Sequence, residues 1–311
     1  MNGQASLTSI AASVLLCAAL SSTASSEPPK GHSDPSVTNK IKSYVIGKAQ
    51  DFTKSQLEHY FPTVELDATW SDNNKPSYGV LLVAPLSDIN NVKDTFFTQE
   101  SLYRRGDRTT INLGLGYRRL ELGDTLLLGV NGFYDHEFRY DHGRTSLGLE
   151  ARTTAGEVNL NRYIALTGWH SAGDGYEEQA LSGWDIEAGI PMPYFNWTKF
   201  YARKFFWSAV EGGEDLQGKD LSLQIQLPIL PNLTIKAGRR DYSGSTAHEK
   251  HLMISYNIVG GNNSKKSQPW ISKKAFSLSS MADHRYDKVR RENLIIKQRR
   301  ASGFTVSVVG F

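Results

Sequence analysis

Histidine and serine side chains are the residues of this 311-residue chain that could support hydrolytic chemistry. Three histidines, His136, His142 and His170, lie near two serines, Ser146 and Ser171. A histidine beside a serine can act as the general base that activates the hydroxyl as a nucleophile. Eight histidines make such pairs common by chance, and the sequence contains no Gly-x-Ser-x-Gly turn. The sequence therefore predicts no catalytic residues.

A metal site is the second chemical alternative in the same region. His136 and His142 lie beside Asp135 and Asp141, and imidazole and carboxylate groups are zinc ligands. These four residues flank a predicted loop, where solvated polar side chains are common, so the sequence predicts neither a metal nor a cofactor. The single cysteine, Cys17, lies in an apolar N-terminal run, so a chain processed after that run would hold no thiol.

The N-terminus has the pattern of an export signal. Residues 10–20 are apolar and lead into the small residues Ser22, Thr23 and Ala24. The run is too short to cross a bilayer, so residues 1–24 are predicted to be a secretory signal peptide. Residues 25–60 are predicted to be a periplasmic segment with a short helix towards its end. A net charge of +3 is too small to indicate a nucleic acid as partner.

Short stretches of alternating apolar and polar residues fill the chain from residue 61 to residue 259. Period-2 alternation is typical of strands whose two faces meet different surroundings. The predicted strands are 64–70, 78–86, 95–104, 109–120, 125–137, 144–152, 157–170, 181–190, 198–207, 221–229, 233–240 and 251–259. A tilted strand of about 9–11 residues crosses a bilayer, and bacterial barrels have an even strand count. The sequence predicts an all-β fold, a 12-stranded antiparallel transmembrane β-barrel over residues 61–259.

Two sets of side chains fit this barrel. Five tryptophans near predicted strand ends are expected at the membrane interfaces, where one ring edge is wet. They are Trp70, Trp169, Trp184, Trp197 and Trp207. Glu150 and Arg152 alternate with apolar neighbours and are predicted to face the lumen. Ordinary core aromatics remain the alternative for the tryptophans.

The chain changes character after residue 259. Residues 260–268 are predicted to be a loop, and residues 281–300 are basic and predicted to be partly helical. Residues 283–300 hold seven Lys and Arg against three Asp and Glu. Such a run is commonly a solvated tail. Its place directly after the last predicted strand instead favours a plug or a linker threaded through the lumen.

Several sequence motifs, in the same order along the chain, resemble those of a known family. They are 129–135 (GVNGFYD), 167–170 (TGWH), 182–186 (SGWDI), 195–201 (FNWTKFY) and 284–296 (HRYDKVRRENLII). Together they resemble the β-domain of the inverse autotransporters, the intimin and invasin group of bacterial surface proteins. The resemblance covers most of the chain after the predicted signal peptide.

The resemblance implies a bacterial outer-membrane barrel that carries a C-terminal passenger outward, where the passenger binds host receptors or other surfaces. Residues 260–300 would form the pore linker, with basic side chains that face acidic lumen residues such as Glu150 and Glu187. The linker residues that carry this expectation are Asp283, His284, Arg285, Tyr286, Asp287, Lys288, Arg290, Arg291, Glu292 and Asn293. Implied partners are outer-membrane lipid, the barrel-assembly machinery, periplasmic chaperones, and a host or surface ligand bound only through a passenger.

Residues 301–311 are expected to be a short remnant, because only eleven residues follow the predicted linker. No passenger lies in this sequence, so a short family member, a truncated frame and an excerpt of a longer product all stay open. Residues 303–311 also resemble the terminal aromatic strand that barrel-assembly machinery recognises. A stand-alone outer-membrane channel or structural barrel is the alternative function.

Overall fold

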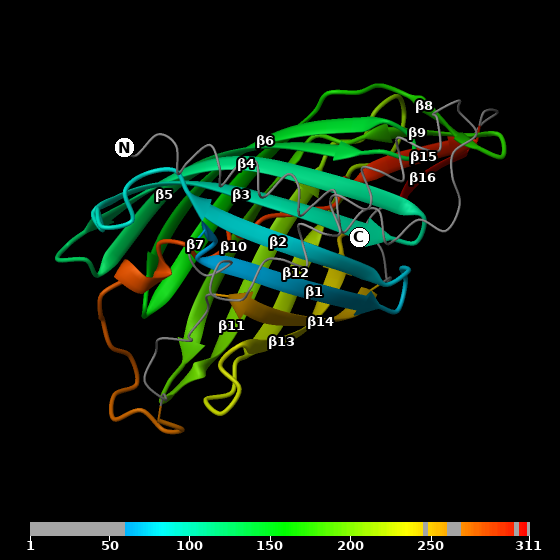
Figure 1. The fold of residues 1–311 in the computed structure, drawn as a ribbon. Helices are drawn as coiled ribbons and strands as arrows, with labels where there is room; N and C mark the ends of the chain where they lie inside the picture. The colour runs from blue at the N-terminus through cyan, green and yellow to red at the C-terminus, as the bar shows by residue number, and fades with distance from the viewer. Residues whose placement is uncertain (1–59, 245–247, 260–268, 302–304, 310–311) are drawn as a thin grey trace, which may run out of the picture.

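Twelve antiparallel strands close into a barrel in the computed structural model, which describes residues 60–244, 248–259, 269–301 and 305–309 (Figure 1). The barrel strands are β1 (Thr63–Ser71), β2 (Ser77–Pro85), β3 (Asp94–Arg105), β4 (Arg108–Glu121), β5 (Leu126–Glu137), β6 (His142–Thr153), β7 (Gly156–Ala165), β10 (Gly183–Met192), β11 (Phe195–Trp207), β12 (Leu216–Ile225), β13 (Leu233–Tyr242) and β14 (His248–Val259). Each pairs with its neighbours along the chain, β7 pairs with β10, and β14 returns to β1. The predicted fold class and strand count are confirmed.

The barrel is polar inside and apolar outside, the reverse of a soluble protein. On β4, Leu113 and Leu115 are exposed, while the alternate residues Asn112, Gly114 and Gly116 are buried. On β6, Leu147 and Leu149 are exposed, and the alternate positions are buried. Alternation of this kind places one face in lipid and the other in the lumen. The closed hydrogen-bond ladder also leaves no strand edge in the membrane.

Two inward glycines make room for aromatic side chains in the lumen. A Cβ on Gly114 would lie 2.2 Å from the ring of Phe133, and one on Gly116 would lie 2.2 Å from Phe97. Both rings therefore lie across a neighbouring strand where only glycine permits this approach. The aromatic side chains narrow the lumen on the side formed by β3, β4 and β5.

The two ends of the barrel differ in their connections. We call the end with the turns at 121–126, 153–156 and 192–195 the entry rim. The opposite end, with the turns at 105–108 and 137–142, is the exit rim. Between β7 and β10 the exit rim carries a hairpin of β8 (His170–Gly173) and β9 (Tyr176–Ala180), shown beside β15 in Figure 1.

A second, four-stranded sheet stands at the exit rim, in the order β16-β15-β9-β8. Its strands β15 (Lys297–Ala301) and β16 (Thr305–Val309) come from the C-terminal part of the chain. This corrects two predictions. The seventh predicted strand does not run to residue 170, because β7 ends at Ala165 and the hairpin follows. Residues 305–309 also do not close the barrel as a terminal strand would, because they pair with β15.

The basic segment predicted to be partly helical is mostly extended. It contains one 3-10 turn, η2 (Ala282–His284), and ends in β15. The helix predicted within residues 25–60 and the signal peptide lie outside the described residues, apart from Tyr60. Within the described ranges, no helix is long and apolar enough to cross a membrane.

Candidate functional site in the barrel lumen

The segment from Met281 to Ile296 crosses the interior of the barrel from the entry rim to the exit rim. Figure 1 shows its turn at residues 282–284, in orange, near one end and β15, in red, near the other. Met281 packs at the entry rim against Leu120 and Leu127. At the exit rim, the amide of Leu181 donates to the carbonyl of Ile296 at 2.9 Å. We call residues 281–296 the lumen segment.

The barrel holds the lumen segment mainly by its backbone carbonyl groups. Eight carbonyls between Arg285 and Leu294 accept hydrogen bonds from inward-facing side chains. The donors are Arg118 to Arg285 (2.8 Å) and Asp287 (2.6 Å), Thr63 to Tyr286 (2.8 Å), Arg152 to Lys288 (3.1 Å), Asn161 to Arg290 (3.0 Å), Arg144 to Glu292 (2.7 Å) and Leu294 (3.1 Å), and Asn112 to Asn293 (2.9 Å). Except for Thr63 on β1, these donors lie on β4, β6 and β7. An extended chain that cannot pair with a strand therefore has its polar backbone satisfied.

The centre of the lumen holds a fully buried triad of one carboxylate and two guanidinium groups. Asp135 on β5 accepts from Arg144 on β6 at 2.8 Å and from Arg291 of the lumen segment at 2.6 Å and 2.9 Å. The side chain of each is 0% exposed. Asn112 also donates to Asp135, at 2.7 Å. Buried charges persist only when paired and hydrogen-bonded, so this triad ties the segment to β5 and β6.

Glu150 is buried, and among the described residues its ion pairs are with arginines of the barrel and not with the basic residues of the lumen segment. It pairs with Arg118 at 2.6 Å and with Arg152 at 2.7 Å, both from the barrel. These two arginines then donate to carbonyls of the segment. Glu150 thus orients the donors, and the expected direct pairing is wrong for this residue.

Two basic side chains of the segment reach the opposite part of the wall. Arg290 pairs with Glu187 on β10 at 2.5 Å and lies over the ring of Tyr201 on β11. Lys288 forms an ion pair with Glu65 on β1. Glu187 therefore meets a basic residue of the segment.

Three apolar contacts anchor the segment along its length. The first is the contact of Met281 at the entry rim, described above. In the second, Tyr286 and Val289 pack with Leu81, Val83, Phe97 and Phe133 from β2, β3 and β5. Near the exit rim, Ile296 packs with Tyr163, Leu181, Phe205 and Trp207. These side chains are buried among an otherwise polar lumen, so they add hydrophobic stabilisation at three points.

Trp207 corrects the prediction of an interface aromatic residue. Its side chain is fully buried in the lumen beside Ile296, because its neighbour Phe206 takes the outward position on β11. Trp169 lies in the exit-rim hairpin region, where its ring contacts Arg300 and its Nε1 donates to Glu211 at 3.1 Å. Trp70 pairs edge-on with Tyr78, Trp184 stacks on Phe206, and Trp197 contacts Trp270. The interface role of these other tryptophans stays a prediction.

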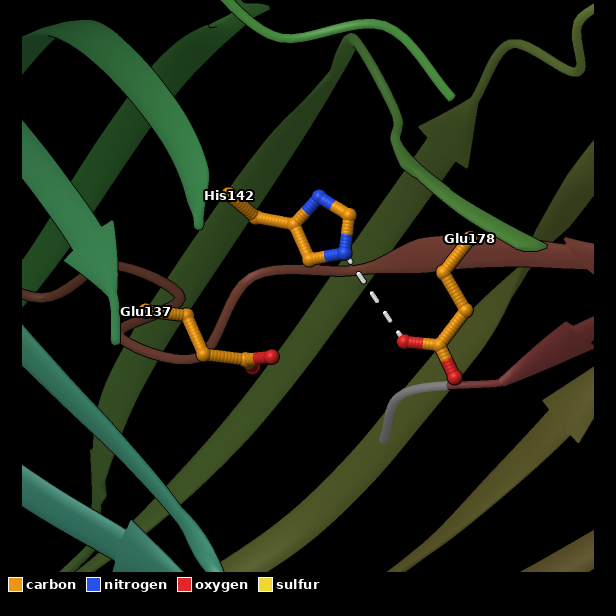
Figure 2. Close-up of side chains that lie close together, drawn as sticks. All are labelled: Glu137, His142 and Glu178. Atoms are coloured by element: carbon orange, nitrogen blue, oxygen red, sulfur yellow. Dashed lines mark ion pairs between the residues drawn. The ribbon is translucent and has the colours of Figure 1, made fainter. Parts of the chain in front are cut away.

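Glu137, His142 and Glu178 meet at the exit rim, where β5, β6 and β9 converge (Figure 2). All three are buried, and their ligand atoms lie within 4.8 Å of one another. One imidazole and two carboxylates form a donor set that suits zinc. Both carboxylates, however, already carry cations: Arg108 lies 2.7 Å from Glu137 and 2.8 Å from Glu178, and Lys297 pairs with Glu137. The cluster is an ion-pair network that joins barrel, hairpin and β15, and this charge balance disfavours a divalent ion.

Glu178 shows how tightly this network holds the hairpin. Burial alone would raise the pKa of its carboxyl group, but interactions with His142 and Arg108 hold that pKa at about 2. Further along the same pair of strands, Arg300 on β15 bonds to Glu177 at 2.9 Å and to Glu211 at 2.6 Å. Backbone pairing between β15 and β9 accompanies these ion pairs.

The histidines, serines and aspartates that the sequence offered as catalytic or metal-binding candidates do not come together in one site. Asp135 and Ser146 face the lumen and bind Arg291, whereas His136 lies 3.6 Å from the exposed Asp141 at the exit rim. His142 faces Glu178 and stacks on His170, and Ser171 lies on β8. No arrangement of the described residues supports the serine nucleophile or the metal set considered above.

Sequence reasoning missed the donors that matter most, Arg118, Arg144 and Asn112. Along each strand, side chains point alternately outward and into the lumen, and these three residues take inward positions. That alternation is visible in the sequence. Their partners lie more than a hundred residues away, so the sequence carries no signal for the contacts themselves.

An apolar exterior, a closed hydrogen-bond ladder and a polar interior define an outer-membrane barrel. The family model described as "Inverse autotransporter, beta-domain" matches residues 17–293. The chain belongs to this family, as its motifs indicated, and it is a protein of the bacterial outer membrane.

Individual relatives agree with this assignment. The chain is 25% identical to intimin of Escherichia coli O157:H7 over 264 residues, 82% of this chain and 28% of intimin. It is 27% identical to the inverse autotransporter adhesin YeeJ of E. coli K12 over 66% of this chain and 9% of YeeJ. Invasin of Yersinia enterocolitica is 26% identical over 66% of this chain and 25% of invasin. The chain therefore spans less than a third of the length of these three relatives.

A solved structure supports the fold. The structure titled "Unveiling the Mechanism Behind the in-meso Crystallization of Membrane Proteins" matches 76% of this chain and 100% of its own, with a TM-score of 0.61 and 19% identity.

Proposed function

We propose that this chain is the outer-membrane translocator and anchor of an adhesin, which exports a C-terminal passenger through the barrel and then holds it at the surface. Residues 260–300 serve as the pore linker in this proposal, and the lumen segment is its ordered part. The exit rim faces the cell exterior, because the linker leaves there.

The observation that carries this proposal is the set of eight carbonyl hydrogen bonds. A barrel that binds a chain through its backbone does not depend on the side chains of that chain. The same donors can therefore hold whichever stretch occupies the lumen while export proceeds. The buried triad at Arg291 then fixes the final position.

A C-terminal epitope tag tests the outward path. Whole cells that express the chain with a tag after Phe311 are treated with a protease that cannot cross the outer membrane. We expect the tag to be removed while the barrel stays intact. A tag that stays protected in intact cells, and becomes sensitive only after lysis, would contradict the proposal.

Adhesion enters only through a passenger. Relatives named as adhesins, intimin and invasin support a passenger that binds host or other surface ligands. Membrane lipid contacts the apolar exterior, and barrel-assembly machinery and periplasmic chaperones would deliver the chain to the membrane. The barrel carries no chemistry of its own in this proposal.

A plain channel is the second candidate function, because cavities lie beside the lumen segment. Single-channel conductance of the full chain and of a chain lacking residues 261–311 separates the two. We expect the deletion to raise the current strongly. Equal currents would show that the segment does not fill the pore, and would favour the channel.

A further inference from the structure

Four basic side chains gather on the outer surface of the barrel, next to the exit rim. Their strands, β11 to β14, lie side by side in the barrel (Figure 1). Each of the four is the third or fourth residue from the exit end of its strand, at an exposed position that alternates with inward ones. They are Lys204 on β11, Lys219 on β12, Arg239 on β13 and Lys250 on β14, and we call them the exterior band.

The strand register places the residues of the exterior band next to one another. Lys204 lies directly opposite Lys219, and Arg239 lies directly opposite Lys250. Residues paired in this way have Cβ atoms about 5 Å apart, and like charges at that separation repel each other. Arg239 also lies diagonally from Lys219, whose own partner on β13 is Asp241. The band is therefore a continuous row of four cations across four neighbouring strands.

Counter-charges for the exterior band are few. Asp241 is the one outward-facing carboxylate within the described parts of β11–β14, and it pairs with Arg239 at 2.7 Å. Among the described residues, Lys204, Lys219 and Lys250 form no ion pair. The exit-rim loop before β12 holds three further carboxylates, which form no ion pair with the band: Glu211, Glu214 and Asp215. The barrel thus leaves these cations unbalanced, whereas it pairs Arg118, Arg144 and Arg152 in the lumen with carboxylates.

Apolar side chains begin directly below the exterior band. Leu221 is the next outward residue after Lys219 on β12, and Leu252 is the next after Lys250 on β14. Both leucines are exposed. Nearer the entry rim, the same outer surface continues with the paired residues Ile225, Ile235 and Ile254. Lysine and arginine at the edge of an apolar surface extend their charges towards the lipid headgroups, so the band lies at the headgroup level of one leaflet.

The entry rim treats an outward-facing cation differently. Arg119, on β4 and 45% exposed, pairs with Glu121 at 2.5 Å and with Asp94 at 3.4 Å. This cation already has two counter-charges from the chain itself. The unbalanced cations of the exterior band instead offer their charges to an anion from outside the chain.

We propose that the exterior band binds a glycolipid whose headgroup carries two phosphate groups, in the leaflet at the exit rim. Each pair of like charges holds one phosphate through charge-assisted hydrogen bonds, and the acyl chains lie along Leu221 and Leu252. A bound phosphate removes the repulsion within each pair. The inference rests on the proposed function in one respect, because that function places the exit rim, and with it this leaflet, at the cell exterior.

Lipid binding by the purified full chain tests the site. Protein in an uncharged detergent is titrated with lipid A that carries two phosphates, and with the same lipid lacking one phosphate. Native mass spectrometry counts the bound lipid. The double variant Lys204→Gln and Lys219→Gln removes one pair of like charges, and Arg119→Gln is the matched control at the opposite rim.

We expect the unaltered chain to bind the two-phosphate lipid more tightly than the one-phosphate lipid. The double variant should bind the two-phosphate lipid about 25-fold more weakly, since each basic side chain near an anionic surface contributes roughly a factor of five. Arg119→Gln should bind as the unaltered chain does. Equal affinities in the double variant and the control would overturn the site. Displacement of the lipid by an equal concentration of inorganic phosphate would overturn the lipid as its ligand.

Unfolding by urea in the same detergent separates binding from a structural role of the lysines. Without lipid, the double variant should unfold at the same urea concentration as the unaltered chain or at a higher one, because it loses a repulsion. The two-phosphate lipid should raise the midpoint of the unaltered chain only. A lower midpoint of the double variant without lipid would assign the lysines to the fold and overturn the site.

The two proposals fail in different experiments. Loss of lipid selectivity in detergent, with a C-terminal tag still exposed on intact cells, would overturn the lipid site alone. Selective lipid binding with a tag that stays protected inside the cell would overturn the translocator function and the placement of the exterior band in the outer leaflet.

Discussion

Two parts of the barrel face the same lumen and treat the segment differently: β3–β7, the holding wall, donates to seven of its eight bonded carbonyl groups, whereas β12–β14, the open wall, donates to none of these eight. The holding wall presents Arg118, Arg144 and Arg152, which are themselves bound by Asp135 or Glu150 and point at carbonyl groups. The open wall borders a cavity of about 400 Å³ near the entry rim, where Thr234, Ser255 and Asn257 are among the lining residues. A barrel can thus bind an extended chain firmly on one side of the lumen and still leave space on the other.

Loss of the central carboxylate of the holding wall, Asp135, should have the largest effect on the stability of the barrel. In Asp135→Asn, Arg144 and Arg291 stay buried without a counter-charge, and removal of one partner from a buried ion pair costs about 3–5 kcal/mol. Unfolding of the barrel by urea in lipid vesicles measures this. Asp241→Asn is the control, since its pair with the exposed Arg239 should contribute at most about 1 kcal/mol. Equal losses in both variants would show that the triad has no special role.

Removal of one carbonyl donor should come next. Arg144→Gln deletes the bonds to the carbonyls of Glu292 and Leu294 and also one of the two cations paired with Asp135, while Arg291 stays paired with that carboxylate; a charged hydrogen bond is worth about 1.5–3 kcal/mol. We expect faster proteolysis of the lumen segment in vesicles. Lys236→Gln on the open wall removes a pair with Glu187 and a cation–π contact with Tyr201, both of them within the barrel, so the segment should stay protected. Faster proteolysis of the segment in the lysine variant than in the arginine variant would contradict the difference between the two walls.

Loss of the space beside Gly114 on the holding wall should lower the stability of the barrel by a smaller amount. Gly114→Ala places a Cβ 2.2 Å from the Phe133 ring, and overpacking of this kind costs about 1–3 kcal/mol. The nearest atom to a Cβ at Gly132, which lies on the neighbouring strand, is 3.6 Å away. Gly132→Ala should therefore leave the urea midpoint nearly unchanged. An unchanged midpoint in Gly114→Ala as well would show that the Phe133 ring moves aside.

The exit-rim sheet should show the smallest effect, and only in acid. The pKa of Glu178 is lowered to about 2, so its pairing stabilises the sheet at pH values above the ordinary carboxyl range. That stabilisation declines as the pH falls from about 4.5 towards 2, where the native carboxylate takes up a proton. Hydrogen exchange of the β15 amides should accelerate over this interval. Glu178→Gln should remove the dependence; its persistence would assign the effect to another group.

Much of the barrel could be predicted because the alternation of residues within a strand shows which side chains face outward and which face the lumen. The predicted ranges 109–120 and 125–137 agree with β4 and β5 to within a residue, and in β4 the residues from Ile111 to Tyr117 are large and apolar at every second position. The predicted strand 221–229 is displaced from β12, which ends at Ile225. Pro228 lacks the N–H that a ladder requires, although Leu227 and Ile229 continue the alternation.

The site was less predictable because its contacts join distant parts of the chain. The motif at residues 284–296 marked the segment, but its extended form depends on carbonyl donors supplied by the barrel, so basic composition alone suggested a helix. Trp207 was placed at the membrane interface from its position near a strand end. The parity of β11 turns it inward, where Ile296 covers it.

The most direct measurement asks which wall the lumen segment touches. Tyr286 is replaced by a photo-crosslinking phenylalanine derivative, which keeps an aromatic ring where the native ring packs against Leu81, Val83, Phe97 and Phe133. Irradiation of the full chain in vesicles, followed by peptide mass spectrometry, should give products on β2, β3 or β5. Products on β12–β14, or none within the barrel, would contradict the account.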